Sequence, residues 1–73
     1  MKGWKDKYRE FRALLVAARK AKGLTQVELG KRIGKPQNFI SKVESGERRI
    51  DLVEFVFLAK ALGIEPMSII RKI

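Results

Sequence analysis

Residues 24–46 read LTQVELGKRIGKPQNFISKVESG, and this stretch predicts two short helices joined by a tight turn. Thr25 occupies an N-cap position and Glu28 follows three residues later, which is the spacing of a capping box. Apolar side chains then recur at helical spacings, so the first helix is expected at about residues 26–33. Gly34 ends that helix, because glycine adopts the left-handed backbone of a helix C-terminus without steric cost. The apolar positions are Val27, Leu29 and Ile33, and Leu24 is placed to form a hydrophobic staple with Leu29.

The second helix of this unit is expected at about residues 36–45. Pro36 suits its first turn, where the missing N–H is not needed, and Gly46 ends it. Ile40 and Val43 form its inward stripe. Five polar side chains are left facing outward: Gln37, Asn38, Ser41, Lys42 and Ser45.

This outward row carries amides, hydroxyls and an ammonium group but no carboxylate. Asn and Gln can form paired hydrogen bonds with adenine, and Lys can donate to the acceptors of guanine. The alternative is a solvated helix face, which such residues also occupy. The preceding capped helix, the tight turn and the basic charge of the chain favour contact with DNA bases.

The charge of the 73-residue chain is large, at +9, and it is unevenly placed. Residues 1–22 hold eight basic and two acidic side chains, residues 23–50 hold six and three, and residues 51–73 hold three and three. The balances are therefore +6, +3 and zero. This asymmetry predicts a polyanionic partner for the first two thirds and a different kind of contact for the last third.

The N-terminal segment predicts a long amphipathic helix at about residues 5–22, which Gly23 ends. Because its aromatic side chains share one face with aliphatic ones, we expect a core stripe rather than a stacking platform for single-stranded nucleic acid. The stripe comprises Trp4, Tyr8, Phe11, Leu15 and Ala18. Attachment to a membrane surface is disfavoured, because Asp6 and Glu10 interrupt the basic face.

Two adjacent arginines, Arg48 and Arg49, lie in a short connection directly beyond the second helix. They can belong to a solvated loop. Their position beside the outward polar row favours a contact with phosphates of the DNA backbone.

The last third predicts two apolar helices, at about residues 52–62 and 66–72. Asp51 and Glu54 have the spacing of a second capping box, and Gly63 and Pro66 separate the two helices. The first of them is apolar almost all round, so one core can cover only one of its sides. The apolar surface that the core leaves uncovered predicts a twofold dimer contact through these two helices. The alternative is a small monomer whose last helix closes its own core.

Several function classes are disfavoured by composition. The chain has no cysteine and no histidine, which removes thiolate metal sites, the commonest metal ligand and the commonest general base. No base–nucleophile pair is visible, so we expect no enzyme activity, no metal and no cofactor. No apolar run approaches the roughly 20 residues that span a bilayer, and no signal peptide is apparent, so the expected location is the cytoplasm.

The chain resembles the Cro/lambda-repressor type of helix-turn-helix regulators, the XRE family. The resemblance rests on the run ARKAKGLTQVELGKRIGKPQNFISKVESGERR and on the following ALGIEP, and it extends over about residues 11–70. It implies an all-α, lambda-repressor-like domain of five helices at about 5–22, 26–33, 36–45, 52–62 and 66–72, with residues 1–73 forming a single domain. The third helix of such a domain enters the major groove.

The resemblance also assigns residues. It implies base contacts by Gln37, Asn38 and Lys42, with Ser41 on the same face touching base or phosphate. It implies contacts with the DNA backbone by Gln26 and Ser45. Arg48 and Arg49 are expected to make such contacts too, because they lie directly beyond the third helix. Arg19 and Glu44 match a structural ion pair that ties the first helix to the third.

Three positions depart from the family pattern. Gly30 replaces a usual alanine, which keeps the close helix approach but weakens the helix. Lys35 replaces an apolar turn residue and is expected to contact a phosphate. Phe39 replaces a small hydroxyl residue. Its ring can contact a thymine methyl or pack on its own turn, and the sequence is compatible with both.

The expected function is a sequence-specific DNA-binding transcriptional regulator, a repressor that binds a palindromic operator in double-stranded DNA as a homodimer. The alternatives are a DNA-binding antitoxin with a toxin partner on its apolar third, and a controller of restriction–modification genes. Binding of duplex RNA is disfavoured, because the deep major groove of RNA does not admit side chains for base contacts.

Overall fold

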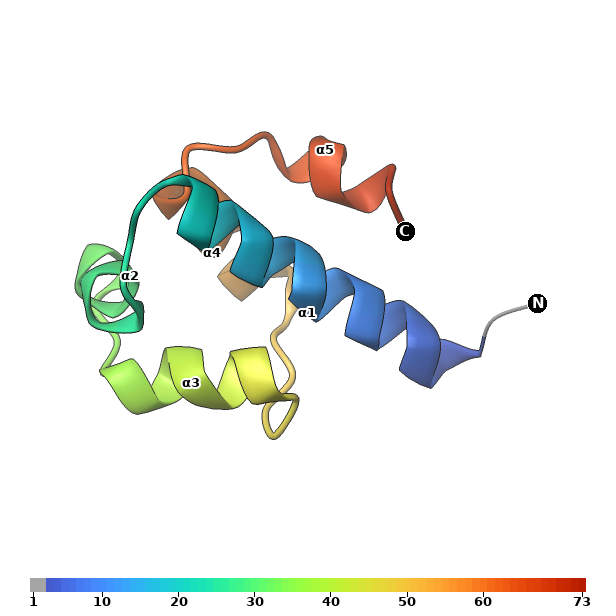
Figure 1. The fold of residues 1–73 in the computed structure, drawn as a ribbon, viewed down its shortest axis with the longest axis horizontal. Coiled ribbons are helices and arrows are strands. Elements are labelled where there is room, and N and C mark those ends of the chain that lie inside the picture. The colour runs from blue at the N-terminus through green and yellow to red at the C-terminus, as the bar shows by residue number, and fades with distance from the viewer. Residues whose placement is uncertain (1–2) are drawn as a thin grey trace.

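Five helices make up the computed structural model over residues 3–73, the residues that it describes, and no strand occurs among them (Figure 1). The all-α architecture expected from the sequence is confirmed. The helices are α1 (Trp4–Ala21), α2 (Gln26–Ile33), α3 (Gln37–Ser45), α4 (Leu52–Ala61) and α5 (Pro66–Ile70).

Five helix ends differ from the expected bounds by one or two residues: both ends of α1, the start of α3, and the ends of α4 and α5. The backbone explains two of them. Pro36 is the N-cap of α3 and not its first residue, because its backbone is extended, with φ −70° and ψ 162°. Helix α5 ends at Ile70 and not at 72, since the N–H groups of Lys72 and Ile73 donate three residues back, to Ile69 and Ile70, which is a tighter turn than an α-helix makes.

Both capping boxes are present. The Oγ1 of Thr25 accepts from the N–H of Glu28 at 3.0 Å, and Oε1 of Glu28 accepts from the N–H of Thr25 at 2.9 Å. The same reciprocal pair joins Asp51 and Glu54 at the start of α4, at 2.7 and 2.9 Å. These bonds satisfy N–H groups that have no partner within the helix, so local sequence fixes where α2 and α4 begin.

A single hydrophobic core holds the helices together. Ile40 and Leu62 are its most enclosed large side chains, with 1% and 2% of their surface exposed. The rings of Phe11 and Phe55 meet edge to face, with centroids 5.2 Å apart, and join α1 to α4. The buried members are Leu15, Leu24, Leu29, Phe39, Ile40, Val43, Phe55, Leu58, Ala59, Leu62 and Ile69.

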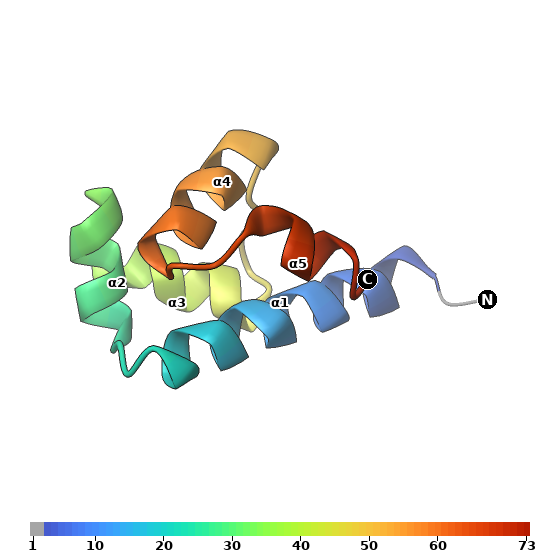
Figure 2. The ribbon, with the colours of Figure 1, turned by 90° about the horizontal axis from the view of Figure 1, so that it is seen from above.

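Two residues placed on buried stripes are exposed. Val27 is 42% exposed, because it precedes Leu29 by two residues and therefore points to the opposite side of α2. Trp4 is 83% exposed, since the first turns of α1 extend past the other helices (Figure 2). Further along the same stripe Tyr8 and Phe11 are half-buried and Leu15 is buried.

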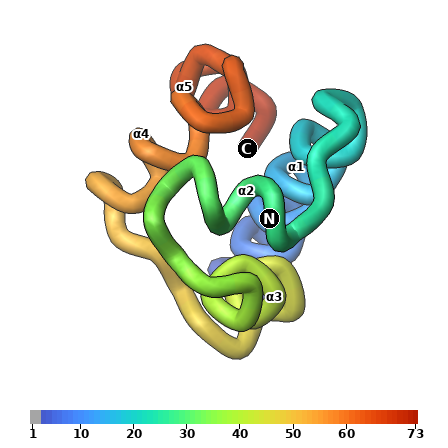
Figure 3. The backbone as a smooth tube through the Cα atoms, turned by 90° about the vertical axis from the view of Figure 1, so that its left-hand side faces the viewer, coloured from blue at the N-terminus to red at the C-terminus, as the bar shows by residue number. Residues whose placement is uncertain are grey.

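Helices α3 and α5 lie on opposite sides of the molecule, with α1 and α4 between them (Figure 3). Within residues 3–73, no helix combines the length and the apolar character needed to cross a membrane. The arrangement therefore gives the protein two separate outer faces, one on α3 and one on α4 and α5.

Replacing Asp51 by alanine tests the cap of α4. The Asp51→Ala variant is expected to lose about 1 kcal/mol of unfolding free energy, because the N–H of Glu54 loses its acceptor. The Asp51→Asn variant is the matched control, since asparagine caps a helix about as well as aspartate. Urea unfolding followed by circular dichroism measures both, and equal losses in the two variants would contradict the cap assignment.

Candidate nucleic-acid interface

The turn between α2 and α3 is tight because its backbone lies almost against α2. Gly34 has φ +70°, and the N–H of Lys35 donates to the carbonyl oxygen of Gly30 at 2.9 Å. A Cβ atom on Gly30 would lie 2.5 Å from the carbonyl oxygen of Lys35, closer than real contacts allow. The glycine at position 30 thus permits the close approach expected from the sequence.

A partly buried ion pair sets the orientation of α3. The guanidinium of Arg19 on α1 donates two hydrogen bonds to the carboxylate of Glu44 on α3, at 2.7 and 2.9 Å, and a third to the carbonyl of Leu24 at 2.9 Å. The two side chains are only 11% and 10% exposed. The hydrogen bond to Glu44 raises the pKa of Arg19 above its ordinary value, so the pair stays charged.

Gln26 extends this pair to α2. Its Nε2 donates to Oε1 of Glu44 at 2.9 Å, and its own Oε1 accepts from Nε2 of Gln37 at 3.4 Å. The chain of bonds runs from α1 through α3 and α2 to the first residue of α3. One amide of the outward row is therefore already oriented by the scaffold.

The polar row of α3 faces away from the core. Gln37, Asn38, Lys42 and Ser45 are exposed and Ser41 is half-buried, while Ile40 and Val43 lie on the buried side. The hydroxyl of Ser45 donates to the carbonyl of Lys42 at 3.2 Å. The predicted base-contacting side chains are thus brought together on one outer face of a single helix.

The two loop arginines both have partners within the protein. Arg48 donates to the carboxylate of Glu54 at 3.2 and 3.0 Å and to the carbonyl of Arg49 at 2.9 Å. The guanidinium of Arg49 lies 4.3 Å from the ring centroid of Tyr8. The bond with Arg48 lowers the pKa of Glu54, and the same bond raises the pKa of Arg48. Their side chains are held in place, which the sequence did not indicate.

Phe39 is buried, with 9% of its surface exposed. Sequence alone left its ring either on a thymine methyl or on its own turn, and the structure packs it into the core cluster. It also contacts cations, since Arg48 lies 4.5 Å and Lys35 5.3 Å from its ring centroid.

A shallow groove of about 450 Å³ between α1 and α3 adds basic side chains that no sequence motif indicated. Arg9, Arg12 and Lys20 line it together with Ser45. The guanidinium of Arg12 reaches the backbone of Gly46, where α3 ends. Helical spacing could have predicted this basic strip, because residues 9, 12, 16 and 20 share one face of a helix.

Comparison with known proteins places this geometry in a family. The family model described as Helix-turn-helix matches residues 15–69. A curated relative from Sinorhizobium fredii, the uncharacterized HTH-type transcriptional regulator y4dJ, is 36% identical over 52 residues, which are 71% of this chain and 68% of that protein. The chain belongs to the XRE-type helix-turn-helix family of transcriptional regulators.

Two solved structures of similar proteins agree with this regulator in fold. An XRE-family like protein from Pseudomonas syringae pv. tomato superposes with a TM-score of 0.89 at 41% identity, over 93% of this chain and 83% of that one. The restriction-modification controller protein C.AhdI from Aeromonas hydrophila superposes with a TM-score of 0.79 at 37% identity, over 85% and 94% of the two chains.

The helix-turn-helix regulator also exposes apolar surface on α4 and α5. Leu52, Val53 and Phe57 on α4 are 72%, 63% and 59% exposed, and Met67 and Ile70 on α5 are each 44% exposed. We call these five side chains the apolar face. The other side of α4 is buried in the core, through Phe55, Leu58 and Ala59.

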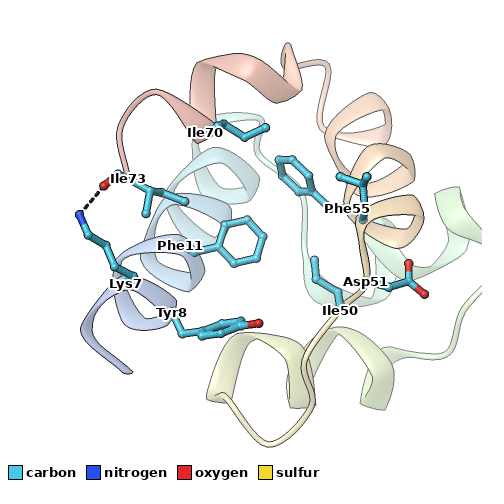
Figure 4. A pocket seen from close by; sticks show the side chains of 9 residues that line it. Lys7, Tyr8, Phe11, Ile50, Asp51, Phe55, Ile70 and Ile73 are labelled. Atoms are coloured by element: carbon cyan, nitrogen blue, oxygen red, sulfur yellow. Dashed lines mark hydrogen bonds between the residues drawn. The ribbon is translucent and has the colours of Figure 1, made fainter. Parts of the chain in front are cut away.

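An apolar groove of about 300 Å³ continues this face toward α1 (Figure 4). Figure 4 shows its lining side chains converging from α1, from the connection before α4 and from the C-terminal segment, where Lys7 donates to the carbonyl oxygen of Ile73. Leu52 and Ile70 belong to both the groove and the apolar face. The groove is thus part of the same outer surface. Among residues 3–73, no group of three or more acidic, histidine or cysteine side chains is placed so that it could hold a metal ion.

Breaking the buried ion pair tests its role in the scaffold. The Glu44→Ala variant is expected to lose at least about 2 kcal/mol of unfolding free energy, because the enclosed charge of Arg19 loses its carboxylate partner and Nε2 of Gln26 loses its acceptor. The Arg9→Ala variant is the control on α1, since its ion pair with Asp6 spans 3.8 Å between exposed side chains. Chemical denaturation measures both, and a loss no larger than that of Arg9→Ala would show that the pair does not hold α3.

Proposed function

We propose that this protein is a sequence-specific DNA-binding regulator that represses transcription by occupying a palindromic operator as a homodimer. The observation that carries the proposal is the outer face of α3. Amide, hydroxyl and ammonium groups gather there on a short helix whose opposite side is locked into the core. Such a face matches the donor and acceptor pattern of the major groove, which admits an α-helix.

The side chains divide into two roles. Gln37, Asn38, Ser41 and Lys42 contact base edges, because they share the outer face of α3. Backbone contacts are supplied by Gln26, Lys35, Ser45, Arg48 and Arg49, which lie at the ends and flanks of that helix. Phosphate contacts fix the position of the protein on the duplex, and the base contacts select the sequence.

Dimer formation is supported by the apolar face. An exposed cluster of large apolar side chains on two successive helices is unusual for a small monomer. The segment that carries it, residues 51–73, has no net charge, so two copies do not repel each other there. Since α3 lies on the opposite side of the molecule from α5, a dimer built through the outer surface of α4 and α5 leaves both α3 faces free for DNA. Residues 1–73 then act as one domain, in the cytoplasm.

A second candidate function is control of restriction–modification genes. It is favoured by the similarity to C.AhdI, which covers most of both chains. An antitoxin role is the third, in which the apolar face binds a toxin instead of a second copy. In both cases α3 still binds DNA, so the three candidates share one DNA interface and differ in the partner or the regulated gene.

Selection of bound duplexes from a random pool tests the base contacts. The wild-type protein is expected to select a palindrome whose half-sites lie about one helical turn apart. Each of Gln37→Ala, Asn38→Ala and Lys42→Ala should relax the preference at particular base pairs, at a cost of about 1–3 kcal/mol for a paired contact. The matched control is Lys31→Ala, which removes an exposed lysine of α2 that has no assigned base contact.

The salt dependence of binding separates this proposal from non-specific adhesion. If each subunit neutralises three or four phosphates, the log–log slope should be near about −6. A slope near zero, or equal affinity for a scrambled duplex, would remove the proposed function.

Charge substitution in the apolar face tests the dimer. The Phe57→Asp variant is expected to sediment as a monomer and to bind the palindrome more weakly, because like charges meet across the twofold axis while the monomer core stays intact. Val27→Asp is the control, since Val27 is also an exposed apolar residue but lies on α2. Analytical ultracentrifugation gives the masses. A wild-type protein that stays monomeric, free and on DNA, or that purifies with an unrelated protein on this face, would contradict the homodimer.

A further inference from the structure

Phe39 lies on α3 directly after Asn38, yet its surroundings differ from those of the outward row. Its ring is 9% exposed and forms part of the core, so little apolar surface remains for a thymine methyl group. Two cations lie against the ring. The guanidinium of Arg48 is 4.5 Å and the ammonium of Lys35 is 5.3 Å from its centroid, both within the range of cation–π attraction.

The two cations come from segments on either side of α3. Lys35 belongs to the turn that precedes the helix, and Arg48 belongs to the connection that follows it. The ring of Phe39 is therefore the common contact that brings the two flanks of α3 together.

Glu54 fixes this arrangement from α4. Its carboxylate accepts two hydrogen bonds from Arg48, and Oε1 also accepts from the N–H of Asp51 at 2.9 Å. The positive charge of Lys35 also helps to lower the pKa of this carboxylate. We call Lys35, Phe39, Arg48 and Glu54 the Phe39 cluster. Its net charge is +1, so it remains attractive to an anion.

Arg48 retains the capacity to bind that anion. It makes three hydrogen bonds within the protein, and a guanidinium has five N–H donors. Its side chain is 41% exposed, and Lys35 is exposed as well. Because both side chains are already held, binding a phosphate immobilises less side-chain freedom than it would for two unrestrained cations.

We propose that Phe39 is a positioning residue, whose ring holds Lys35 and Arg48 as a pair of phosphate-contacting cations beside α3 and does not itself contact a base. The proposal rests on the proposed function, since it requires that α3 enters the major groove. Phe39 then contributes to affinity for any duplex but not to sequence preference.

The experiment compares Phe39→Leu, which keeps an apolar side chain but removes the π face, with Phe39→Tyr, which keeps the ring. Binding to the selected duplex and to a scrambled one is measured across a salt series, and base preference is measured by selection from a random pool. Thermal unfolding confirms that each variant is folded at the assay temperature.

Phe39→Leu is expected to weaken binding to both duplexes by the same factor, about three- to tenfold, and to reduce the magnitude of the salt slope by about one to two. The selected sequence should not change, and Phe39→Tyr should restore both affinity and slope. A purely structural role for Phe39 predicts a lower melting temperature with an unchanged slope.

Two surface variants test the same cluster without altering the core. Lys35→Ala and Arg48→Ala should each reduce the magnitude of the slope by about two, because each variant removes one phosphate contact from both subunits of the dimer. Arg48→Ala should weaken binding less in the Phe39→Leu background than in the wild type. If Phe39→Leu does not fold, these two variants decide: an unchanged slope in both overturns the proposal.

Two further outcomes are distinguishable. Loss of preference at a single base pair in Phe39→Leu, with the slope unchanged, overturns the proposal and makes Phe39 a base-contacting residue. Absence of salt-dependent binding by the wild-type protein to every duplex removes the proposed function itself.

Discussion

The bond between Arg19 and Glu44 is the interaction on which the presentation of α3 depends. It is nearly enclosed, it is bidentate, and Gln26 adds a third helix to it. The buried stripe of Phe39, Ile40 and Val43 determines which side of α3 faces the core, but apolar contact has no direction and sets the tilt and offset of the helix only loosely. A planar guanidinium against a carboxylate has a direction, so this pair fixes where α3 lies relative to α1 and α2.

The rest of the surface follows from that constraint. With Ile40 and Val43 turned inward, the amides and Lys42 must lie outside, and the flanking cations of Lys35 and Arg48 converge on Phe39. The apolar face lies on α4 and α5, over the segment without net charge, and α5 is on the opposite side of the molecule from α3 (Figure 3). Attraction to a polyanion and contact between apolar surfaces are thus separated in space and do not compete.

The starts of the two capped helices, α2 and α4, were the most predictable features. Thr25 with Glu28 and Asp51 with Glu54 form bonds within four residues of chain, so their geometry depends on local sequence. Burial was predicted where periodicity is strong, as for Leu15, and failed for Val27 and Trp4, where the helix points away from or extends beyond its neighbours. The contact of Arg49 with Tyr8 was not predictable, because it joins distant segments, and the contacts of Arg48 with Glu54 and Phe39 depend on how the connection after α3 folds back.

The sequence by itself determined the five helices, the caps, the polar row of α3 and the uneven charge, since these depend on neighbours in the chain and on composition. The Arg19–Glu44 pair came from the resemblance and not from spacing, as its members are 25 residues apart. Only the tertiary structure decided that Phe39 is buried, that two cations lie on its ring and that Glu54 holds one of them. Such contacts form when separate helices pack, and no local pattern encodes which side chains then meet.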